Sequence, residues 1–198
     1  MYDEDVISNN RAGTLVEPIR IPNDGEVTSV TFDGINGDNV QKWVIDFDIF
    51  ATINPSAVAN LYMIFNGSNV AGNIMYRERV EGIVSGAGVD TTTVNTNTGS
   101  FRLATMLAAH SGYKFQGTIE ISPMKTNIYD DVYSVSHNAD RKIKSSALHG
   151  VSGVETGESR CNGSYIATDT ITSITLVISG SNLMHGVFEL FEEERCWE

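Results

Sequence analysis

Cysteine and proline are scarce in this sequence, and each scarcity excludes a class of protein. The 198 residues include two cysteines, Cys161 and Cys196. Neither lies in a CxxC motif or in a cluster with histidine, so the ligand spacing of a zinc or iron–sulfur site is absent. Whether the two form a disulfide depends on their distance in the fold, and we expect free thiols. Only 4 prolines accompany 18 glycines, which excludes collagen-like and proline-rich chains.

Basic residues and long apolar runs are also few. Lysine and arginine together number 13 against 25 aspartates and glutamates, which gives a net charge of −12. DNA or RNA would be repelled, because nucleic-acid affinity relies on lysine and arginine. The start MYDEDVISNN lacks the positive and apolar regions of a signal peptide, and no run approaches the roughly 20 apolar residues of a membrane span. We therefore expect no secretion signal, no membrane segment and no nucleic-acid partner.

Apolar residues recur with a period of two, which is typical of half-buried strands. The clearest case is WVIDFDIF, residues 43–50, where every second side chain is large and apolar. Because successive side chains of a strand point to opposite faces, one set should be buried. The expected core positions are Trp43, Ile45, Phe47 and Ile49, and Val44, Asp46, Asp48 and Phe50 should point to the other face.

Ten segments are predicted as strands, separated by turn-forming sequences such as PNDG and FNGSN. Many short strands joined by such turns indicate a sandwich or a barrel. We predict an all-β fold with little helix, in which residues 1–13 form an acidic arm and residues 14–198 a single domain. The predicted strands are Thr14–Ile21, Glu26–Phe32, Lys42–Ile53, Asn60–Asn66, Asn73–Val84, Tyr113–Ser122, Ile128–His137, Arg141–Leu148, Ile171–Ser179 and Gly186–Glu192.

Three other segments have different patterns. Gly82–Ser100 and Gly150–Gly163 are rich in small polar residues and are predicted as long loops. Phe101–His110 contains residues of good helix propensity but is short, so a helix and a strand remain equally open.

Asp46 and Asp48 are the most suggestive pair of charged residues. They lie two positions apart on one face of a predicted strand, which separates their Cα atoms by roughly 7 Å. Two carboxylates can perform glycoside hydrolysis at such a spacing. Charged residues on a strand face far more often belong to a solvated surface. We prefer the surface interpretation and keep hydrolysis as a hypothesis.

Other catalytic and binding motifs are missing from the sequence. The histidines show no HExxH spacing, GxSxG is absent, and SGAG at Ser85–Gly88 fits neither phosphate-binding pattern. Asp130 and Asp131 are adjacent and would face opposite ways in a strand. We therefore assign no catalytic, cofactor-binding or metal-binding residue and expect no enzyme. The histidines are His110, His137, His149 and His185.

Two further groups of residues have mainly structural interpretations. Arg141, Lys142 and Lys144 form a local basic cluster, which we expect on an edge strand, where lysine blocks unwanted pairing. Several tyrosines are candidates for stacking on sugars, although most are expected in the core or at an interface. They are Tyr62, Tyr76, Tyr113, Tyr129, Tyr133 and Tyr165. Trp197 is expected either to dock on a neighbouring subunit or to be disordered.

The stretch LYMIFNGSNVAGNIMY, Leu61–Tyr76, resembles a pattern of virion proteins of tailed bacteriophages. In that pattern an apolar strand ends in Asn-Gly, a short polar loop follows, and Asn-x-x-Tyr opens the next strand. Asn66, Gly67, Asn73 and Tyr76 carry it here. A long strand precedes the pattern in those proteins, and WVIDFDIF occupies that place in this chain.

A second stretch, Asn162–Glu192, is similar to the closing segment of the same proteins. There, a Thr-rich strand of the form ITSI is followed by a short loop, a glycine and a final apolar strand. Ile171–Ile174 begin this strand, Ser179–Asn182 form the turn, and Gly186 opens the last strand. Many relatives close with Leu-Tyr-Gly, whereas this chain closes with GVFELFE and keeps the alternation.

The resemblance covers residues 40–192 and implies a jelly-roll-like antiparallel β-sandwich used as a building block. It implies a capsid decoration or cement protein that binds the particle surface, has other virion proteins as partners and forms an oligomer, with a trimer favoured. The alternatives are a tail or baseplate protein and a receptor-binding module for a host surface glycan. The expected location is the virion, assembled in the bacterial cytoplasm. Asn66, Gly67 and Gly186 are expected to serve the fold.

Overall fold

The computed structural model describes residues 14–37, 40–52, 59–67, 73–106, 112–122, 126–129, 136–139, 141–151, 153–167, 169–180 and 182–194. Within these ranges the helical structure is one short turn, η1 (Asn23–Gly25), and no helix is long and apolar enough to cross a membrane. The strands are β1 (Thr14–Ile21), β2 (Ser29–Asp33), β3 (Val40–Thr52), β4 (Asn60–Phe65), β5 (Ile74–Val84), β6 (Ala87–Thr98), β7 (Phe101–Thr105), β8 (Tyr113–Ser122), β9 (Thr126–Tyr129), β10 (Ser136–Ala139), β11 (Arg141–Val151), β12 (Glu155–Tyr165), β13 (Ser173–Ile178) and β14 (Leu183–Glu194).

Eight of these strands follow the connectivity of a jelly roll. Neighbours in one sheet are β1, β14, β3 and β8, and neighbours in the other are β2, β13, β4 and β7. All the pairs are antiparallel. Numbered by their order among the eight, the strands run 1-8-3-6 and 2-7-4-5, which is the double Greek key of the jelly roll. The predicted all-β, jelly-roll-like sandwich is confirmed.

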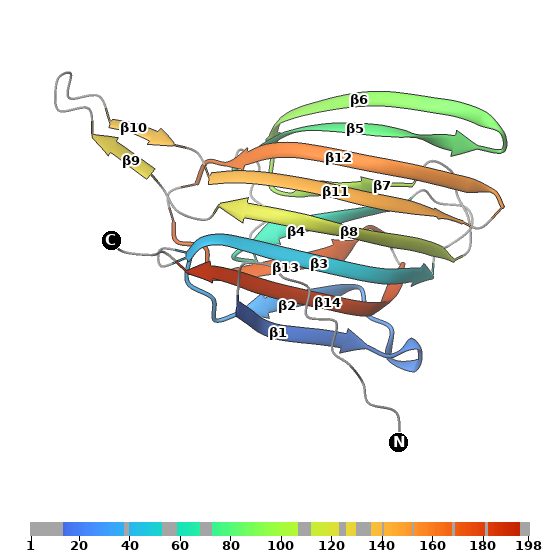
Figure 1. Ribbon diagram of the computed structural model, residues 1–198, viewed down its shortest axis with the longest axis horizontal. Helices are drawn as coiled ribbons and strands as arrows, with labels where there is room; N and C mark the ends of the chain where they lie inside the picture. The colour runs from blue at the N-terminus through green and yellow to red at the C-terminus, as the bar shows by residue number, and fades with distance from the viewer. Residues whose placement is uncertain are drawn as a thin grey trace.

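Two insertions widen the first sheet to eight strands. Strands β5 and β6 lie in sequence between β4 and β7, and β9–β12 lie between β8 and β13 (Figure 1). The sheet order becomes β1-β14-β3-β8-β11-β12-β5-β6, with β9 and β10 as a separate hairpin. The insertions interlock, because β12 lies between β11 and β5.

The core fills the space between the two sheets. Trp43, Ile45 and Ile49 are fully buried and Phe47 is 2% exposed, which confirms the predicted inner face of β3. Residues of the smaller sheet complete the core, and among them are Leu61, Met63, Phe65, Ile174 and Leu176. The alternating apolar side chains of both sheets are therefore sufficient to set the two layers face to face.

The two segments expected as loops contain long strands, so those predictions are wrong. β6 occupies most of Gly82–Ser100, and β12 most of Gly150–Gly163. A Cβ added at Gly157 would lie 2.4 Å from Cε1 of His149, and one at Gly163 would lie 2.6 Å from Cε2 of Phe101. Because glycine has no side chain, these two positions leave room for an aromatic ring of a neighbouring strand, and they do not mark turns. In β6, consecutive threonines favour an extended backbone because they are β-branched.

The structure also tests the predictions for Ile128–His137 and Phe101–His110. Ile128–His137 was predicted as one strand, but β9 and β10 are separate strands that pair with each other, so the chain reverses between them. Asp130 and Asp131 lie outside the described ranges. For Phe101–His110 the strand alternative is correct over β7, and residues 107–110 lie outside the described ranges.

Candidate functional site

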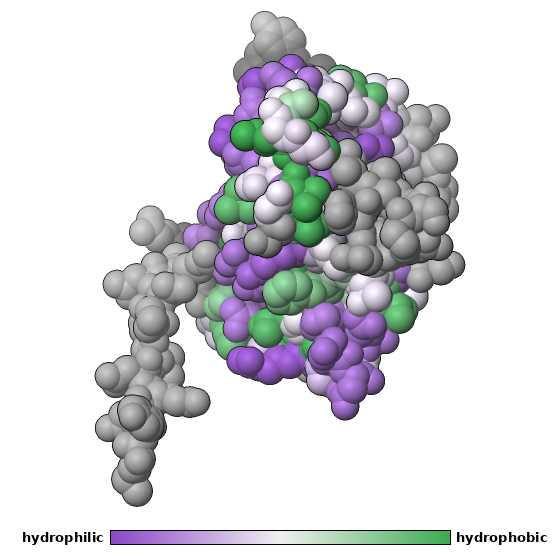
Figure 2. Space-filling model, turned by 90° about the vertical axis from the view of Figure 1, so that its right-hand side faces the viewer, coloured by the Kyte–Doolittle hydropathy of each residue, from purple (hydrophilic) through white to green (hydrophobic). Residues whose placement is uncertain are grey.

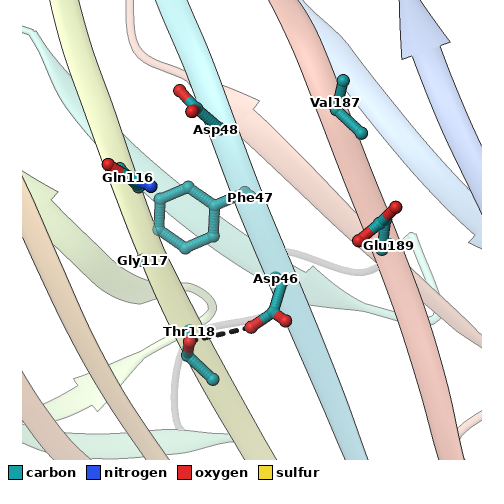
Figure 3. A pocket seen from close by; sticks show the side chains of 8 residues that line it. All are labelled: Asp46, Phe47, Asp48, Gln116, Gly117, Thr118, Val187 and Glu189. Carbon is teal, nitrogen blue, oxygen red and sulfur yellow. Dashed lines mark hydrogen bonds between the residues drawn. The ribbon is translucent and has the colours of Figure 1, made fainter. Parts of the chain in front are cut away.

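The outer face of the eight-stranded sheet carries a polar hollow, drawn in Figure 3. Asp46 and Asp48 project from β3 on this face, because they alternate with the buried Phe47 and Ile49. The hollow has a volume of about 220 Å³. Its lining residues come from β3, β8 and β14: Asp46, Phe47, Asp48, Gln116, Gly117, Thr118, Val187 and Glu189.

Both aspartates have partners on β8. Thr118 Oγ1 donates a hydrogen bond of 2.8 Å to Asp46 Oδ1, and Lys114 Nζ lies 3.1 Å from Asp48 Oδ1. Glu189 stands opposite Asp46 in the ladder between β14 and β3. A glycoside hydrolase requires a general acid held in an apolar setting. The open, polar surroundings of this pair fit a binding surface better than a hydrolytic centre.

An aromatic cluster adjoins the polar hollow. The rings of Phe50 and His185 stack with centroids 5.6 Å apart, and Lys114 Nζ lies 5.4 Å from the centroid of Phe50. His185 Nδ1 lies 3.1 Å from Glu26 Oε1. A second hollow of about 400 Å³ includes Phe50, Lys114, Gln116 and Leu148. Gln116 therefore lines both hollows. Figure 2 faces the side of the molecule on which β3 and β11 end and β8 begins (Figure 1), and hydrophobic and hydrophilic residues are interspersed there.

A buried polar network crosses the inner side of the inserted strands. Glu78 of β5 is 1% exposed and forms an ion pair of 3.0 Å with Arg102 of β7. Thr105 Oγ1 donates to Glu78 Oε1 at 2.7 Å, and Ser159 Oγ accepts a bond from the Thr105 backbone N–H at 3.3 Å. Burial raises the pKa of Glu78, and its hydrogen bonds to Thr105 and Arg102 oppose that shift.

His149 of β11 continues this network. Its Nε2 lies 3.1 Å from Ser159 Oγ, and its Nδ1 lies 3.1 Å from the hydroxyl of Tyr113. Burial lowers the pKa of His149 to about 4, because the interior disfavours the charged imidazolium. His149 is 4% exposed and its Nδ1 also lies 3.8 Å from Glu155 Oε1 of β12, so its contacts join β11 to β8 and β12.

The basic cluster does not lie on an edge strand, so that prediction is wrong. β11 is hydrogen-bonded to β8 on one side and to β12 on the other. Lys142 and Lys144 are exposed on the outer face, as their spacing predicts, while Arg141 is 2% exposed and donates to the carbonyl oxygen of Ala167. The lysines therefore contribute charge to the broad face of the sheet.

Asn66 joins the two stretches that carry the phage resemblance. Its Nδ2 donates to Asp169 Oδ2 at 2.6 Å and to the carbonyl oxygen of Thr170 at 2.8 Å. Its Oδ1 accepts bonds from the backbone N–H groups of Thr172, at 2.7 Å, and Ser173, at 3.3 Å. Asn66 has φ +54°, a left-handed conformation that asparagine tolerates. The side chain thus clamps the β4 turn to the segment that enters β13.

The remaining sequence candidates are dispersed. Tyr76, Tyr113 and Tyr165 are buried, and Tyr62 is half-buried beneath the Arg102 guanidinium. Cys161 is a buried free thiol. Within the described ranges, no group of three or more histidine, cysteine, aspartate or glutamate side chains is placed to hold a metal ion. The candidates outside the described side chains are His110, Tyr129, Tyr133, His137, Cys196 and Trp197.

Two parts of the outer face have no local signal in the sequence. Gln116 and Glu189 line the polar hollow, but each lies far in sequence from Asp46 and only the sheet ladder brings them together. Phe50 was placed on the outer face by alternation, while its contacts with His185 and Lys114 depend on β14 and β8. This surface forms because strands far apart in the sequence pair with one another. No short sequence motif encodes that pairing.

No protein-family model and no curated protein sequence matches this chain. Solved structures with a distant likeness include infectious bursal disease virus, Gt strain, with 10% identity and a TM-score of 0.17 over 92% of this chain and 38% of that chain. Another is the CBM2 module of an evolved Dit of Lactobacillus casei BL23 phage J-1, with 11% identity and a TM-score of 0.20 over 85% of this chain and 70% of that chain. The chain thus spans 38% of the length of the first neighbour. At these TM-scores the fold assignment rests on strand connectivity alone.

Proposed function

We propose that this chain is a structural component of a tailed-phage virion, namely a capsid decoration or cement protein that oligomerises and binds the particle surface. The observation that carries the proposal is the Asn66 clamp. The two stretches that resemble phage virion proteins form neighbouring strands, β4 and β13, and Asn66 of one bonds Thr172 and Ser173 of the other. The resemblance therefore falls on one structural unit of the jelly roll, a fold that viral capsid proteins use.

The shape of the molecule suits a role as a surface module. The inserted strands extend one sheet well beyond the sandwich, which gives a broad outer face with charged residues on most strands. Interfaces of such modules with a lattice depend on surface complementarity and need no catalytic group. Fold alone does not determine function, so the proposal joins the fold to the two motifs. The partners we propose are other virion proteins, in a particle assembled in the host cytoplasm.

Electron microscopy of intact virions labelled with an antibody to this chain tests the proposal directly. Label over the head is the expected result, and label restricted to the tail or its tip would replace the cement role by the tail or baseplate alternative. Absence of label on every particle would refute the virion role. Deletion of residues 1–10 tests the acidic arm, since we expect the truncated chain to lose particle binding while retaining its β-sheet circular dichroism.

A host glycan is a second candidate ligand, favoured by the polar hollow of Asp46, Gln116 and Thr118 beside Phe50. Carboxylate and amide oxygens accept hydrogen bonds from sugar hydroxyls, and the acidic side chains would repel sialic or uronic acids. A neutral or amino sugar is therefore expected. An array of glycans should show binding that Gln116→Ala weakens and that Asn162→Ala, on exposed β12 surface, leaves unchanged. An array on which nothing binds would remove this candidate.

A further inference from the structure

Strand β6 forms one edge of the eight-stranded sheet. It is the last strand in the sheet order, and in the part of the chain that the structure describes its ladder partner is β5 alone. Its 12 residues, AGVDTTTVNTNT, contain no proline, lysine or arginine. Figure 1 shows β6 at the margin of the molecule, beyond the smaller sheet. Its register with β5 runs without a shift from Ala87 to Asn95, and a long edge of this kind offers its free backbone groups to another strand.

The opposite edge of the same sheet is protected in the usual ways. β1 contains Glu17, Pro18 and Arg20, and its register with β14 shifts between Leu15 and Glu17. Proline, charge and a bulge each hinder pairing with a further strand. The edges of the smaller sheet, β2 and β7, are only five residues long. β6 carries one charge, at Asp90, and its register with β5 shifts between Asn95 and Thr98, but the stretch from Ala87 to Asn95 has no proline, lysine or bulge. Among the described strands, β6 is therefore the long edge with the least protection.

The β5–β6 turn determines which backbone groups of β6 are free. Ser85 and Gly86 both have positive φ, 48° and 84°, and Val84 is paired with Ala87. In a two-residue hairpin the pair beside the turn is hydrogen-bonded, and bonded and non-bonded pairs then alternate. The register runs without a shift from there to Val94. The N–H and C=O groups directed away from β5 are therefore those of Gly88, Asp90, Thr92 and Val94.

We propose that β6 pairs antiparallel with β6 of a second copy of this chain, so that two sheets become one continuous sheet across a twofold axis. Charge favours this occupant. Asp90 is the single charged residue of β6, and Arg79 of the neighbouring strand neutralises it at 3.0 Å. The chain's excess negative charge lies elsewhere, since β14 alone ends in several glutamates. Pairing at β6 keeps those acidic strands far apart.

The sequence of β6 also suits antiparallel pairing with a second copy of the same strand. In a pairing centred on Thr92, Thr92 faces its copy, Thr91 faces Thr93, and Asp90 faces Val94. Cross-strand threonine pairs are favourable, and no like charges meet in this arrangement. Val94 is 64% exposed in the single chain, so pairing also removes apolar surface from water. Isologous contacts of this type are the commonest symmetric interfaces.

A proline and alanine pair of variants at Thr92 tests the proposal. Thr92→Pro removes an outward N–H without breaking a bond to β5, whereas Thr92→Ala removes the side chain and keeps the N–H. By analytical ultracentrifugation we expect a dimer for the wild type and Thr92→Ala and a monomer for Thr92→Pro. Val94→Lys is a second variant expected to give a monomer, because lysine on an edge opposes pairing. Circular dichroism checks that each variant retains its β-sheet.

Hydrogen exchange locates the contact residue by residue. The amides of Asp90, Thr92 and Val94 should be protected in the wild-type dimer and should exchange rapidly when the wild type is diluted below its dissociation constant, whereas the amides of Thr91 and Thr93 stay protected in both states. A monomeric wild type, or a dimer or trimer unaffected by Thr92→Pro, would overturn the proposal. A monomeric wild type whose particle binding is lost in Thr92→Pro would also overturn self-pairing, and would identify a strand of a particle protein as the occupant. The virion role is tested separately by the labelling experiment.

Discussion

Replacement of Asn66 is the most informative single change in this protein. Asn66→Ala removes the hydrogen bonds to Thr170, Thr172 and Asp169 and leaves an alanine at φ +54°. Roughly 2 kcal/mol is expected from the lost hydrogen bonds, at about 1 kcal/mol for each bond that water does not replace. The left-handed backbone adds about 1 kcal/mol. The free energy of unfolding should therefore fall by about 3 kcal/mol.

Two companion variants separate these contributions. Asn66→Gly loses the hydrogen bonds but not the backbone conformation, so it should be about 1 kcal/mol more stable than Asn66→Ala. Asn66→Asp places a second carboxylate beside Asp169, where the amide now donates at 2.6 Å. Combining Asn66→Asp with Asp169→Asn reverses the donor and the acceptor and should recover part of the loss.

Urea unfolding at pH 7, followed by circular dichroism, measures all four variants. For a domain of this length, a loss of about 3 kcal/mol corresponds to a fall in Tm of roughly 6–12 °C. Asn162→Ala, at an exposed position of β12, is the control and should change stability by less than about 0.5 kcal/mol. A loss below about 1 kcal/mol for Asn66→Ala would refute the clamp, as would equal stability of the alanine and glycine variants.

Three further predictions concern the buried polar groups. Glu78→Ala leaves the Arg102 guanidinium without its buried partner and should lower stability by about 3–5 kcal/mol in urea unfolding, with a smaller loss for Glu78→Gln. His149 has a folded pKa of about 4 against 6.5 when unfolded, so the unfolded state binds the extra proton and stability should fall by up to about 3 kcal/mol between pH 6.5 and pH 4. His149→Gln should flatten that dependence. Burial raises the pKa of the Cys161 thiol to about 12. In a Cys196→Ser background, a disulfide reagent should therefore react slowly with Cys161 until urea unfolds the chain. A fast reaction of the folded protein would contradict the burial of Cys161.

Strands with strict apolar alternation were predictable from sequence. The bounds of β1 and β8 match the predicted segments, and the inner face of β3 was identified from WVIDFDIF. β6 and β12 were missed because their residues are small or polar. In β12 the inward positions include Gly157, Ser159 and Cys161, and both Gly157 and Ser159 lie against the His149 ring of β11. Glycine signals a close approach there, and sequence alone does not distinguish that from a turn.

The candidate site was predictable only in part. Alternation placed Asp46, Asp48 and Phe50 together on one face of a strand, and the structure places them there. Lys114, Thr118 and Glu189 join them through the pairing of β3 with β8 and β14. Such pairing links positions far apart in the chain, so neither the ion pair nor the hollow has a local signature.

The interlocked insertions impose an order on folding. The β5–β6 hairpin closes through a two-residue turn and has mostly local contacts, so it can form early. Among the described strands, β12 is the one through which the hairpin joins the sheet, with Arg79 opposite Arg160, and that strand is synthesised much later. During translation the outer backbone groups of both β5 and β6 therefore stay unpaired until β12 has been synthesised. This interval is the period of greatest exposure to misassembly, and rapid completion of the β11–β12 hairpin ends it.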